Sequence, residues 1–285
     1  MLVDTHAHLD FPEFAGEVDA VVARAREAGV SRIIVIGTTL ESSRQALRFA
    51  EQYPGVYAVV GIHPTSVSRE REDFIHELQQ LADHPKVVAI GETGLDYHYL
   101  PSSLRKREVS ETTFGASSTD TIEAELADEA EIDTQAAAFE QQLELAAAKS
   151  KNVVIHQRDA WEDTVRILRP YSSRVRGVFH CFNGTIEQAS EAIALGHYIS
   201  FTGIVTFKNA MDLREVAANI PEERIMVETD APFLAPVPFR GKRCEPAFVR
   251  ETAAAIAAVR KTAFETFSTQ TTKNAERFFG LQTIS

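Results

Sequence analysis

The chain has 285 residues, 44% hydrophobic and 25% charged, a balance typical of soluble globular proteins with a sizeable core. It holds no apolar run long enough to cross a membrane and starts without a signal-peptide pattern, so we expect a cytoplasmic protein with no membrane partner. Two cysteines, Cys181 and Cys244, are too few for a disulfide framework and indicate free thiols. The net charge of −12 is opposite to that of proteins that coat duplex nucleic acid, so a nucleic-acid substrate would need a local cationic patch or bound cations.

Short apolar runs, rich in β-branched residues, alternate with helical patterns along the whole chain. The expected strands cover residues 2–8, 32–39, 56–64, 87–97, 152–160, 176–184, 198–204 and 224–232. Apolar stripes predict amphipathic helices near 18–28, 74–81, 139–146 and 213–220. The alternation predicts an α/β fold, a (β/α)8 TIM barrel formed by residues 1–285 as a single domain. An open doubly wound sheet is the competing architecture, which is less favoured because no glycine-rich dinucleotide-binding pattern follows the first strand.

Residues 100–134, after the fourth expected strand, read as an insertion of unusual composition. Its middle, SETTFGASSTDT, has little apolar surface to bury, which predicts flexibility. The segment holds nine acidic and three basic residues, a net charge of −6, half that of the chain. Alanine, glutamate and leucine in its acidic part also favour a helix that runs into the one starting near Thr134. The insertion would emerge where the strands end, either without a role or as a segment that repels polyanions.

The first expected strand, in the stretch VDTHAHLDF, ends in two histidines. Side chains alternate between the two faces of a strand, so Asp4, His6 and His8 are predicted to point the same way. Two imidazoles on one face can bind a single metal ion. The competing interpretation is a pair of surface histidines on an edge strand.

The C-terminal ends of six expected strands carry side chains that commonly bind metals. They are His6 and His8, His63, Glu92, His156, His180 and Asp230. Counting back two residues from these positions reaches plausible barrel-interior residues, such as Ile90 before Glu92 and Val154 before His156. One buried histidine alone is usually structural. Six strands that aim such groups at the end of a barrel where active sites lie predict a metal site.

The remaining histidines serve as an internal comparison. His197 precedes the seventh expected strand, His76 falls in a helical stretch and His84 in a helix-to-strand connection, so we expect ordinary surface histidines there. His98 follows the fourth strand and is a possible residue of the active-site mouth.

The ordered series of these motifs is similar to that of the TatD family of metal-dependent hydrolases. The blocks are DTHAHLD, GIHP, GETGLDY, VIHQRDA, VFHCFNG, SFTGIVTFKNA, VETDAPFLAP, PFRGKRCEPAFV and TTKNAERFFGL. They run from the first strand almost to the C-terminus. Two features depart from the family pattern: Cys244 stands where asparagine is usual, and the segment 100–134 is longer than usual.

The resemblance implies a (β/α)8 hydrolase with two divalent metal ions. It implies that His6, His8 and Asp230 hold the first ion, that His156 and His180 hold the second, and that Glu92 bridges both. His63 matches a position near the site, which we interpret as a substrate contact or a group that supports a ligand. Family members are described as magnesium-dependent DNases, often 3′–5′ exonucleases, so the resemblance implies a nucleic-acid substrate, most simply single-stranded DNA.

Hydrolysis of a phosphodiester needs a nucleophile and shielding of the phosphate charge, and two cations supply both. Glu92 and Asp230 are the predicted catalytic residues: Glu92 would hold the two ions at their spacing, and Asp230 would accept a proton from the attacking water. An imidazole-rich site suits Zn, Mn or Co better than Mg, which prefers oxygen ligands. The metal therefore stays open among Mg, Mn and Zn.

A polyanionic substrate also needs cations and stacking surfaces near the site. Arg158 lies two residues after His156 and is therefore expected on the same face of the strand, and Arg240 and Lys242 follow the eighth strand. These three are the predicted substrate contacts besides His63. The alternative is that they are scattered solvated cations. Three aromatic residues near strand ends, Tyr97, Phe182 and Phe239, are candidates for base stacking.

Other functions compete with the DNase interpretation. Cyclic-amide hydrolases of the wider group often use a carbamylated lysine as the metal bridge, and the fourth strand offers Glu92 instead. Removal of D-amino acids from tRNA, an ester cleavage reported for relatives of the family, stays open as the alternative enzyme function. A metal-bound scaffold without activity would be favoured only if ligands were missing, and the predicted set is complete.

Overall fold

The computed structural model describes residues 1–103 and 118–281. Its strands form one eight-stranded sheet in the order β1 to β8, and every neighbouring pair is parallel. They are β1 (Leu2–Ala7), β2 (Val30–Ile36), β3 (Val56–Val60), β4 (Val87–Asp96), β5 (Asn152–Arg158), β6 (Gly177–Phe179), β7 (Tyr198–Phe201) and β8 (Ile225–Val227). The segment after β8 returns to β1, where the Asp230 amide donates to His6 O at 2.9 Å and the His8 amide to Ala231 O at 2.8 Å. The predicted (β/α)8 barrel is confirmed.

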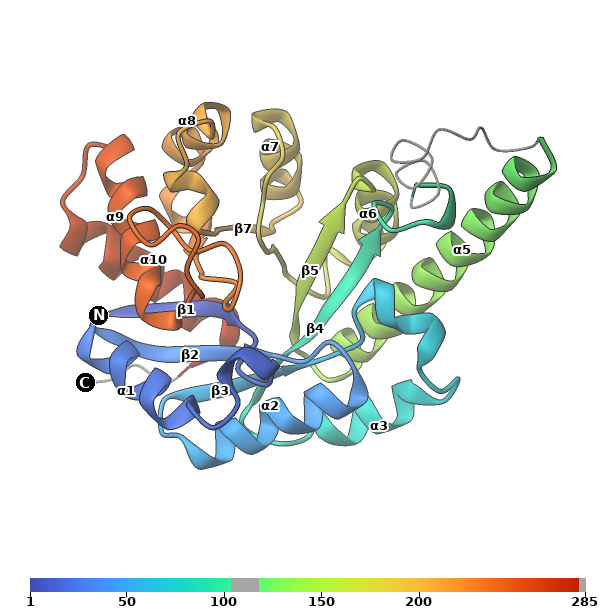
Figure 1. The fold of residues 1–285 in the computed structure, drawn as a ribbon, viewed down its shortest axis with the longest axis horizontal. Coiled ribbons are helices and arrows are strands. Elements are labelled where there is room, and N and C mark those ends of the chain that lie inside the picture. Colours follow the sequence, from blue (N-terminus) through green and yellow to red (C-terminus); the bar gives the residue numbers. More distant parts are fainter. Residues whose placement is uncertain (104–117, 282–285) are drawn as a thin grey trace.

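Helices surround the strands (Figure 1). Those of the described residues are α1 (Val18–Glu27), α2 (Leu40–Gln52), α3 (Phe74–Leu81), α5 (Ser118–Ala148), α6 (Trp161–Leu168), α7 (Ile186–Ala194), α8 (Met211–Asn219), α9 (Val249–Val259) and α10 (Phe264–Phe279). Helix α2 begins with a reciprocal cap between Thr39 and Ser42, and α10 ends at Gly280 in the left-handed region, φ 62°. The four expected amphipathic helices are confirmed. Within the described ranges, no helix is both long and apolar enough to span a membrane.

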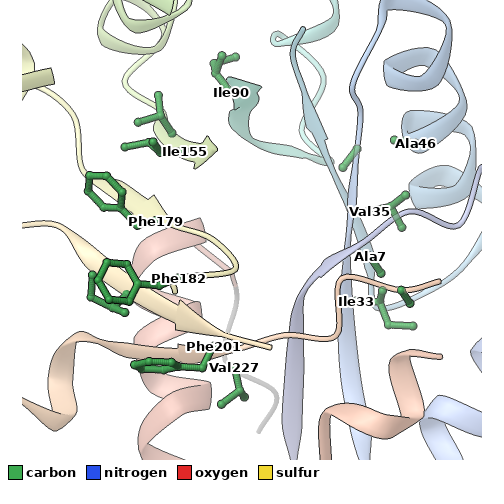
Figure 2. Packing of buried hydrophobic residues seen from close by; sticks show 14 of the residues in the cluster. Ala7, Ile33, Val35, Ala46, Ile90, Ile155, Phe179, Phe182, Phe201 and Val227 are labelled. Carbon is green, nitrogen blue, oxygen red and sulfur yellow. The ribbon is translucent and has the colours of Figure 1, made fainter. Parts of the chain in front are cut away.

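Two hydrophobic clusters pack on opposite sides of the strands. The outer cluster joins strand residues such as Ile33, Ile155 and Phe201 to the surrounding helices (Figure 2). The inner cluster draws at least one residue from each strand and closes with the end of α10: Val3, Ile34, Ile36, Val59, Ala89, Val154, Val178, Tyr198, Met226, Ala275, Phe278, Phe279 and Leu281. The inner cluster fills the barrel, so the strand ends beyond it are supported from below.

Two strands depart from regular alternation just before their site residues. Between Asp4 and Ala7, β1 advances three residues while β2 advances two, and β4 gains one residue on β5 between Ile90 and Thr93. Each extra residue shifts the side chains that follow to the opposite face. As a result Ala89, not the expected Ile90, belongs to the inner cluster, while Ile90 packs in the outer one.

The predicted insertion is partly described. The expected acidic helix is confirmed as the first half of α5, which continues without a break to Ala148 and extends away from the barrel in Figure 1. Residues 104–117, which carry most of the segment predicted to be flexible, lie outside the described residues.

The surface assignment of His197 is wrong. Its side chain is fully buried; Nδ1 accepts from the Gly177 amide at 2.9 Å and Nε2 lies 3.0 Å from Ser172 Oγ. Both partners come from the turn and strand packed beside it, which local sequence does not reveal. His76 is exposed as predicted, and His84 is partly exposed with Nε2 3.3 Å from Glu51 Oε1.

Candidate metal centre

The C-terminal ends of the strands meet around one cavity of about 330 Å³. It is lined by His8, Phe11, Thr38, His63, Thr65, Ser66, Glu92, His156, His180, Asp230 and Phe233. His6 lies behind them, fully buried. The structure therefore brings together all seven residues that sequence reasoning placed at strand ends.

Glu92, only 3% exposed, stands in the middle of this group. Its Oε2 faces the β1 histidines, 3.4 Å from His6 Nε2 and 3.8 Å from His8 Nε2. The carboxylate of Asp230 completes that side, with Oδ1 3.4 Å from His8 Nε2 and 3.7 Å from His6 Nε2. One oxygen of Glu92 thus shares a small space with two imidazoles and a second carboxylate.

The other oxygen of Glu92 faces a second group of imidazoles. Oε1 lies 2.7 Å from His180 Nε2, 2.9 Å from His156 Nδ1 and 3.6 Å from His63 Nε2. His63 is therefore close enough to act as a ligand itself, beside the substrate role expected of it. The two oxygens divide the site into two halves that share one carboxylate.

The orientation of the imidazoles fits metal ligation. His8 Nδ1 lies 3.3 Å from Ile36 O, His156 Nε2 lies 3.0 Å from Asp96 Oδ2, and His180 Nδ1 lies 3.4 Å from Glu228 Oε1. A ring proton held on these outer nitrogens leaves the inner nitrogens, which face Glu92 or Asp230, to bind a cation.

The inward-facing lone pairs form sets suited to cations. Three groups have ligand atoms within 4.8 Å of one another: His6, Glu92 and His180; His6, His8 and Asp230; and His63, Glu92 and His156. Lone pairs and carboxylates at such distances repel one another unless a cation or proton lies between them. The donor set therefore fits divalent metal ions.

The carboxylates of the site are held in their charged form. Burial opposes ionisation of Glu92, but the surrounding His180, His63 and His6 keep its pKa well below the ordinary value. Burial also opposes ionisation of Asp230, and the His8 hydrogen bond and neighbouring His6 lower its pKa. Both groups are thus ready to bind a cation.

Three buried acidic side chains support the site: sequence reasoning missed Asp96 and Glu228 and misplaced Asp4. Asp96 and Glu228, each 1% exposed, face the outer nitrogens of His156 and His180. Asp4 does not join His6 and His8 as predicted, because its oxygens accept from the Thr229 amide at 2.9 Å and from Thr229 Oγ1 at 2.6 Å. Thr229 precedes Asp230, so Asp4 fixes the loop that carries this carboxylate.

A signal for Glu228 was present in the sequence. It lies two residues before Asp230 in the stretch VETD, and two-residue alternation along the strand points its side chain into the barrel. Asp96 offered a similar signal, because it lies four residues after Glu92 and two-residue counting along the strand reaches it.

Neither cysteine has the properties of a nucleophile. Burial raises the pKa of the Cys181 thiol well above its ordinary value, and burial raises that of Cys244 as well. The Cys181 amide donates to Glu228 Oε1 at 2.6 Å. Cys244, fully buried, places Sγ 4.0 Å from Thr229 O, so it packs against the loop that bears Asp230.

The predicted cationic contacts are not among the residues that line this cavity. Arg158 is exposed and lies over the Tyr99 ring at 5.3 Å. Arg240 and Lys242, both exposed, lie over Phe207 at 3.8 Å and over Phe239 at 5.8 Å. Arg158 is the last residue of β5, and Arg240 and Lys242 lie in the loop after β8, so all three follow strands whose C-terminal ends carry site residues.

The aromatic residues suggested for stacking all make contacts within the protein, and Phe182 is too buried to meet a base. Phe182 is buried at 5% exposure between Trp161 and Phe201, the Tyr97 hydroxyl donates to Asp163 Oδ2 at 2.9 Å, and Phe239 stacks on Phe248. Tertiary packing satisfies all three. The suggested mouth residue His98 lies 3.0 Å from Asp159 Oδ2 on the β4–β5 side. The aromatic residues of the cavity are Phe11 and Phe233.

Comparison with known proteins finds relatives that match over nearly the whole chain. The family model described as TatD related DNase matches residues 3–280. The chain is 38% identical to the metal-dependent hydrolase YabD of Bacillus subtilis, over 98% of this chain and 99% of that protein. It is 36% identical to the 3′–5′ ssDNA/RNA exonuclease TatD of Edwardsiella piscicida, over 98% and 100% of the two chains.

Solved structures share the architecture. The TatD homologue YJJV of Escherichia coli superposes with a TM-score of 0.83 at 29% identity, over 99% of this chain and 98% of that one. A TatD family hydrolase of Entamoeba histolytica has the same fold, with a TM-score of 0.79 at 22% identity over 99% and 98% of the two chains. The chain therefore belongs to the TatD-related DNase family, a family of metal-dependent hydrolases.

Proposed function

We propose that the protein hydrolyses phosphodiester bonds of DNA with two divalent metal ions, as a 3′–5′ exonuclease acting on single strands. The observation that carries the proposal is the position of Glu92, whose Oε2 faces His6 and His8 while its Oε1 faces His156 and His180. Relatives from Edwardsiella piscicida and Klebsiella pneumoniae carry the name 3′–5′ ssDNA/RNA exonuclease, which supports the choice of substrate.

The chain's own residues divide the work between two half-sites. His6, His8 and Asp230 would hold one ion, His156 and His180 would hold the other, and Glu92 would be shared between them. Two divalent ions, when bound, would supply an activated water and neutralise the charge of the phosphate. Asp230, ionised and 14% exposed at its side chain, accepts the proton that the attacking water releases.

The substrate contacts follow from position. His63 faces Glu92 Oε1 from the cavity wall, where a phosphate oxygen would lie. Its Nδ1 accepts from the Thr65 amide at 3.2 Å and lies 2.8 Å from Thr65 Oγ1, so the proton of the neutral ring is on Nε2, which can donate to a phosphate oxygen. The exposed side chains of Arg158, Arg240 and Lys242 contact phosphates further along the nucleic-acid strand.

The chemical types of the ligands narrow the choice of metal. Five imidazoles and two carboxylates suit Zn or Mn by their nitrogen content, whereas magnesium prefers oxygen. The test therefore compares Mg, Mn and Zn on single-stranded DNA, duplex DNA, RNA and D-aminoacyl-tRNA. We expect fastest cleavage of single-stranded DNA; faster release of D-amino acids from tRNA would favour the ester-hydrolase alternative.

Glu92→Ala tests the bridging role. We expect cleavage of single-stranded DNA to fall by more than about 100-fold, with a melting profile like that of the wild type when both proteins are free of metal, because both half-sites lose their shared ligand. Glu27→Ala, at an exposed position on α1, is the matched control and should cleave at the wild-type rate. Near-normal turnover of Glu92→Ala at saturating metal would rule out the two-metal assignment.

A further inference from the structure

The aromatic pair Phe11 and Phe233 forms one wall of the metal-bearing cavity. We infer that this pair binds the base of the strand's terminal nucleotide by stacking, which rests on the proposed nuclease function. The site then recognises a nucleotide at two points, the phosphate at the metal centre and the base at the aromatic wall.

The rings form a continuous series that begins at a metal ligand. Phe11 stacks on His8 with ring centres 5.0 Å apart and planes inclined by 27°. Phe233 meets the edge of Phe11 at 5.5 Å and 81°. The edge-to-face contact uses only part of the Phe233 ring and leaves the rest available to a ligand.

Exposure of Phe233 is the unusual feature. The chain buries its large apolar side chains efficiently, and six of those in the described ranges remain strongly exposed: Met1, Tyr99, Leu126, Met211, Phe233 and Val237. Of these six, Phe233 is the one that lines the metal-bearing cavity, and it is 46% exposed. A ring left in water beside a charged cavity gains free energy when a flat apolar ligand covers it.

Both rings are fixed relative to metal ligands. The Phe233 amide donates to Asp230 O at 2.9 Å, and the Phe11 amide donates to His8 O at 3.4 Å. Each ring therefore lies three residues from a ligand, in a turn closed by a hydrogen bond. This arrangement holds a stacked base at a constant distance from the scissile phosphate.

Stacking also accounts for a single-strand preference. Every base has a flat face, so a ring binds any base without reading its sequence. A base inside a duplex already stacks on its neighbours and pairs with its partner, whereas a terminal unpaired base can turn onto the wall at little cost. The charged part of the site binds phosphate in either case, so the wall supplies the discrimination.

The test uses the whole protein and two single-stranded oligonucleotides, one normal and one lacking the base of its 3′-terminal nucleotide. For the wild type we expect the missing base to raise KM about tenfold with little change in kcat, the effect of one stacked base. Phe233→Ala should raise KM about tenfold on the normal strand and leave it unchanged on the strand without the base. Phe233→Trp should restore the wild-type KM.

Val237→Ala is the control, because Val237 is 48% exposed, follows Phe233 in the same loop and does not line the cavity. It should behave as the wild type on both strands. A binding measurement without turnover uses 2-aminopurine as the terminal base: stacking on Phe233 should quench its fluorescence in the wild type and not in Phe233→Ala.

The outcomes separate this inference from the proposed function. Cleavage by the wild type that is equally efficient with and without the terminal base overturns the stacking inference alone, even where Phe233→Ala fails to fold. An equal rise in KM for Phe233→Ala on both strands overturns it as well. A wild-type protein that neither binds nor cleaves any oligonucleotide overturns the nuclease function and the inference together.

Discussion

Glu228 shows how one buried side chain holds several parts of the site. Its Oε1 accepts from the Cys181 amide at 2.6 Å and lies 3.4 Å from His180 Nδ1, while Oε2 accepts from Ser200 Oγ at 2.5 Å. Ser200 Oγ in turn lies 3.2 Å from Thr5 Oγ1, so strands β8, β7 and β1 are linked behind the metal ligands. We regard Glu228 as a positioning residue for His180.

Glu228→Gln keeps the size of the side chain but removes its charge. A neutral amide is a weaker acceptor for the His180 ring proton, so the ring becomes a less basic ligand. We expect metal affinity in calorimetric titrations to fall about 10- to 100-fold, with a similar loss of activity that excess metal partly restores. Glu223→Gln, at an exposed position, should leave affinity unchanged. Wild-type affinity in Glu228→Gln would contradict the positioning role.

His197 makes stability depend on pH. Burial, with the charges of Arg176 and Arg224, lowers the pKa of His197 to about 3, below the ordinary value of 6.5. Its Nδ1 accepts the Gly177 amide proton, so a proton on that nitrogen would break the bond. Between pH 6.5 and 3 the unfolded chain binds a proton there that the native protein does not. The free energy of unfolding therefore falls as pH falls, by on the order of 1 kcal/mol per pH unit.

His197→Asn separates this contribution from those of the other histidines. Asparagine keeps an acceptor close to the position of Nδ1 and does not titrate. We expect the variant to lose less stability than the wild type between pH 6 and 4 in urea unfolding, whatever its stability at pH 7. Parallel curves for the two proteins over this range would show that His197 does not cause the dependence.

At the scale of elements, α5 joins the acidic part of the predicted insertion to the helix that precedes β5. The helix runs from Ser118 to Ala148, and Gln135 and Gln142 anchor its second half to the barrel. Gln135 accepts from the Asp96 amide at 2.9 Å, and Gln142 from the Ile62 amide at 2.9 Å. The acidic residues Asp128 and Glu129 precede these anchors, and Ser102, in the segment that follows β4, donates its amide to Asp128 Oδ1 at 2.8 Å. The acidic part thus lies on the side of the barrel where β4 ends.

Shortening the segment 100–134 to a few residues tests whether its negative charge hinders polyanions. Relative to the intact protein, the shortened protein should gain more in its rate of cleaving long single strands than in its rate of cleaving a dinucleotide. This difference should shrink at high salt, because screening weakens the repulsion. The cut must end before Gln135, so that the anchors of α5 remain. Equal rate changes on long and short substrates at low and high salt would show that the segment has no electrostatic role.

At the scale of the whole molecule, the barrel gathers charges that repel one another. Glu92 and Asp230 converge with five imidazoles in one buried space, above the inner cluster that fills the barrel. The assignment of residues 1–285 to one domain stays a prediction. The site itself draws on β1, β4, β5 and the segments after β3, β6 and β8, so its integrity depends on closure of the whole sheet.

Removal of metal should therefore lower thermal stability. An ion that binds only the native protein, at 100 times its Kd, stabilises it by about 2.7 kcal/mol, which corresponds to a melting temperature about 5 °C or more higher. We expect chelation to lower the melting temperature by that amount and added Mn or Zn to restore it. Glu92→Ala should show a smaller shift, because it binds metal less well. An identical shift in both proteins would place the stabilising ion elsewhere.

The sequence alone determined the barrel and the set of residues at its mouth. Alternating apolar runs define strands through the two-residue period of a strand and helices through their 3.6-residue period, both local properties. Parallel strands of a barrel end on the same side, so histidines and carboxylates at six strand ends had to meet. This reasoning found His6, His8, His63, Glu92, His156, His180 and Asp230.

Only the tertiary structure decided features that depend on distant partners. The extra residues in β1 and β4 can be recognised only from the pairing of these strands with β2 and β5. Two-residue counting along the sequence therefore did not predict the packing of Ile90 or the partner of Asp4. Burial of His197 and Phe182 depends on neighbouring elements, and so does exposure of Phe233. Burial is a property of the surroundings that a side chain meets after folding, and the same residue type satisfies the local pattern whether it is covered or not.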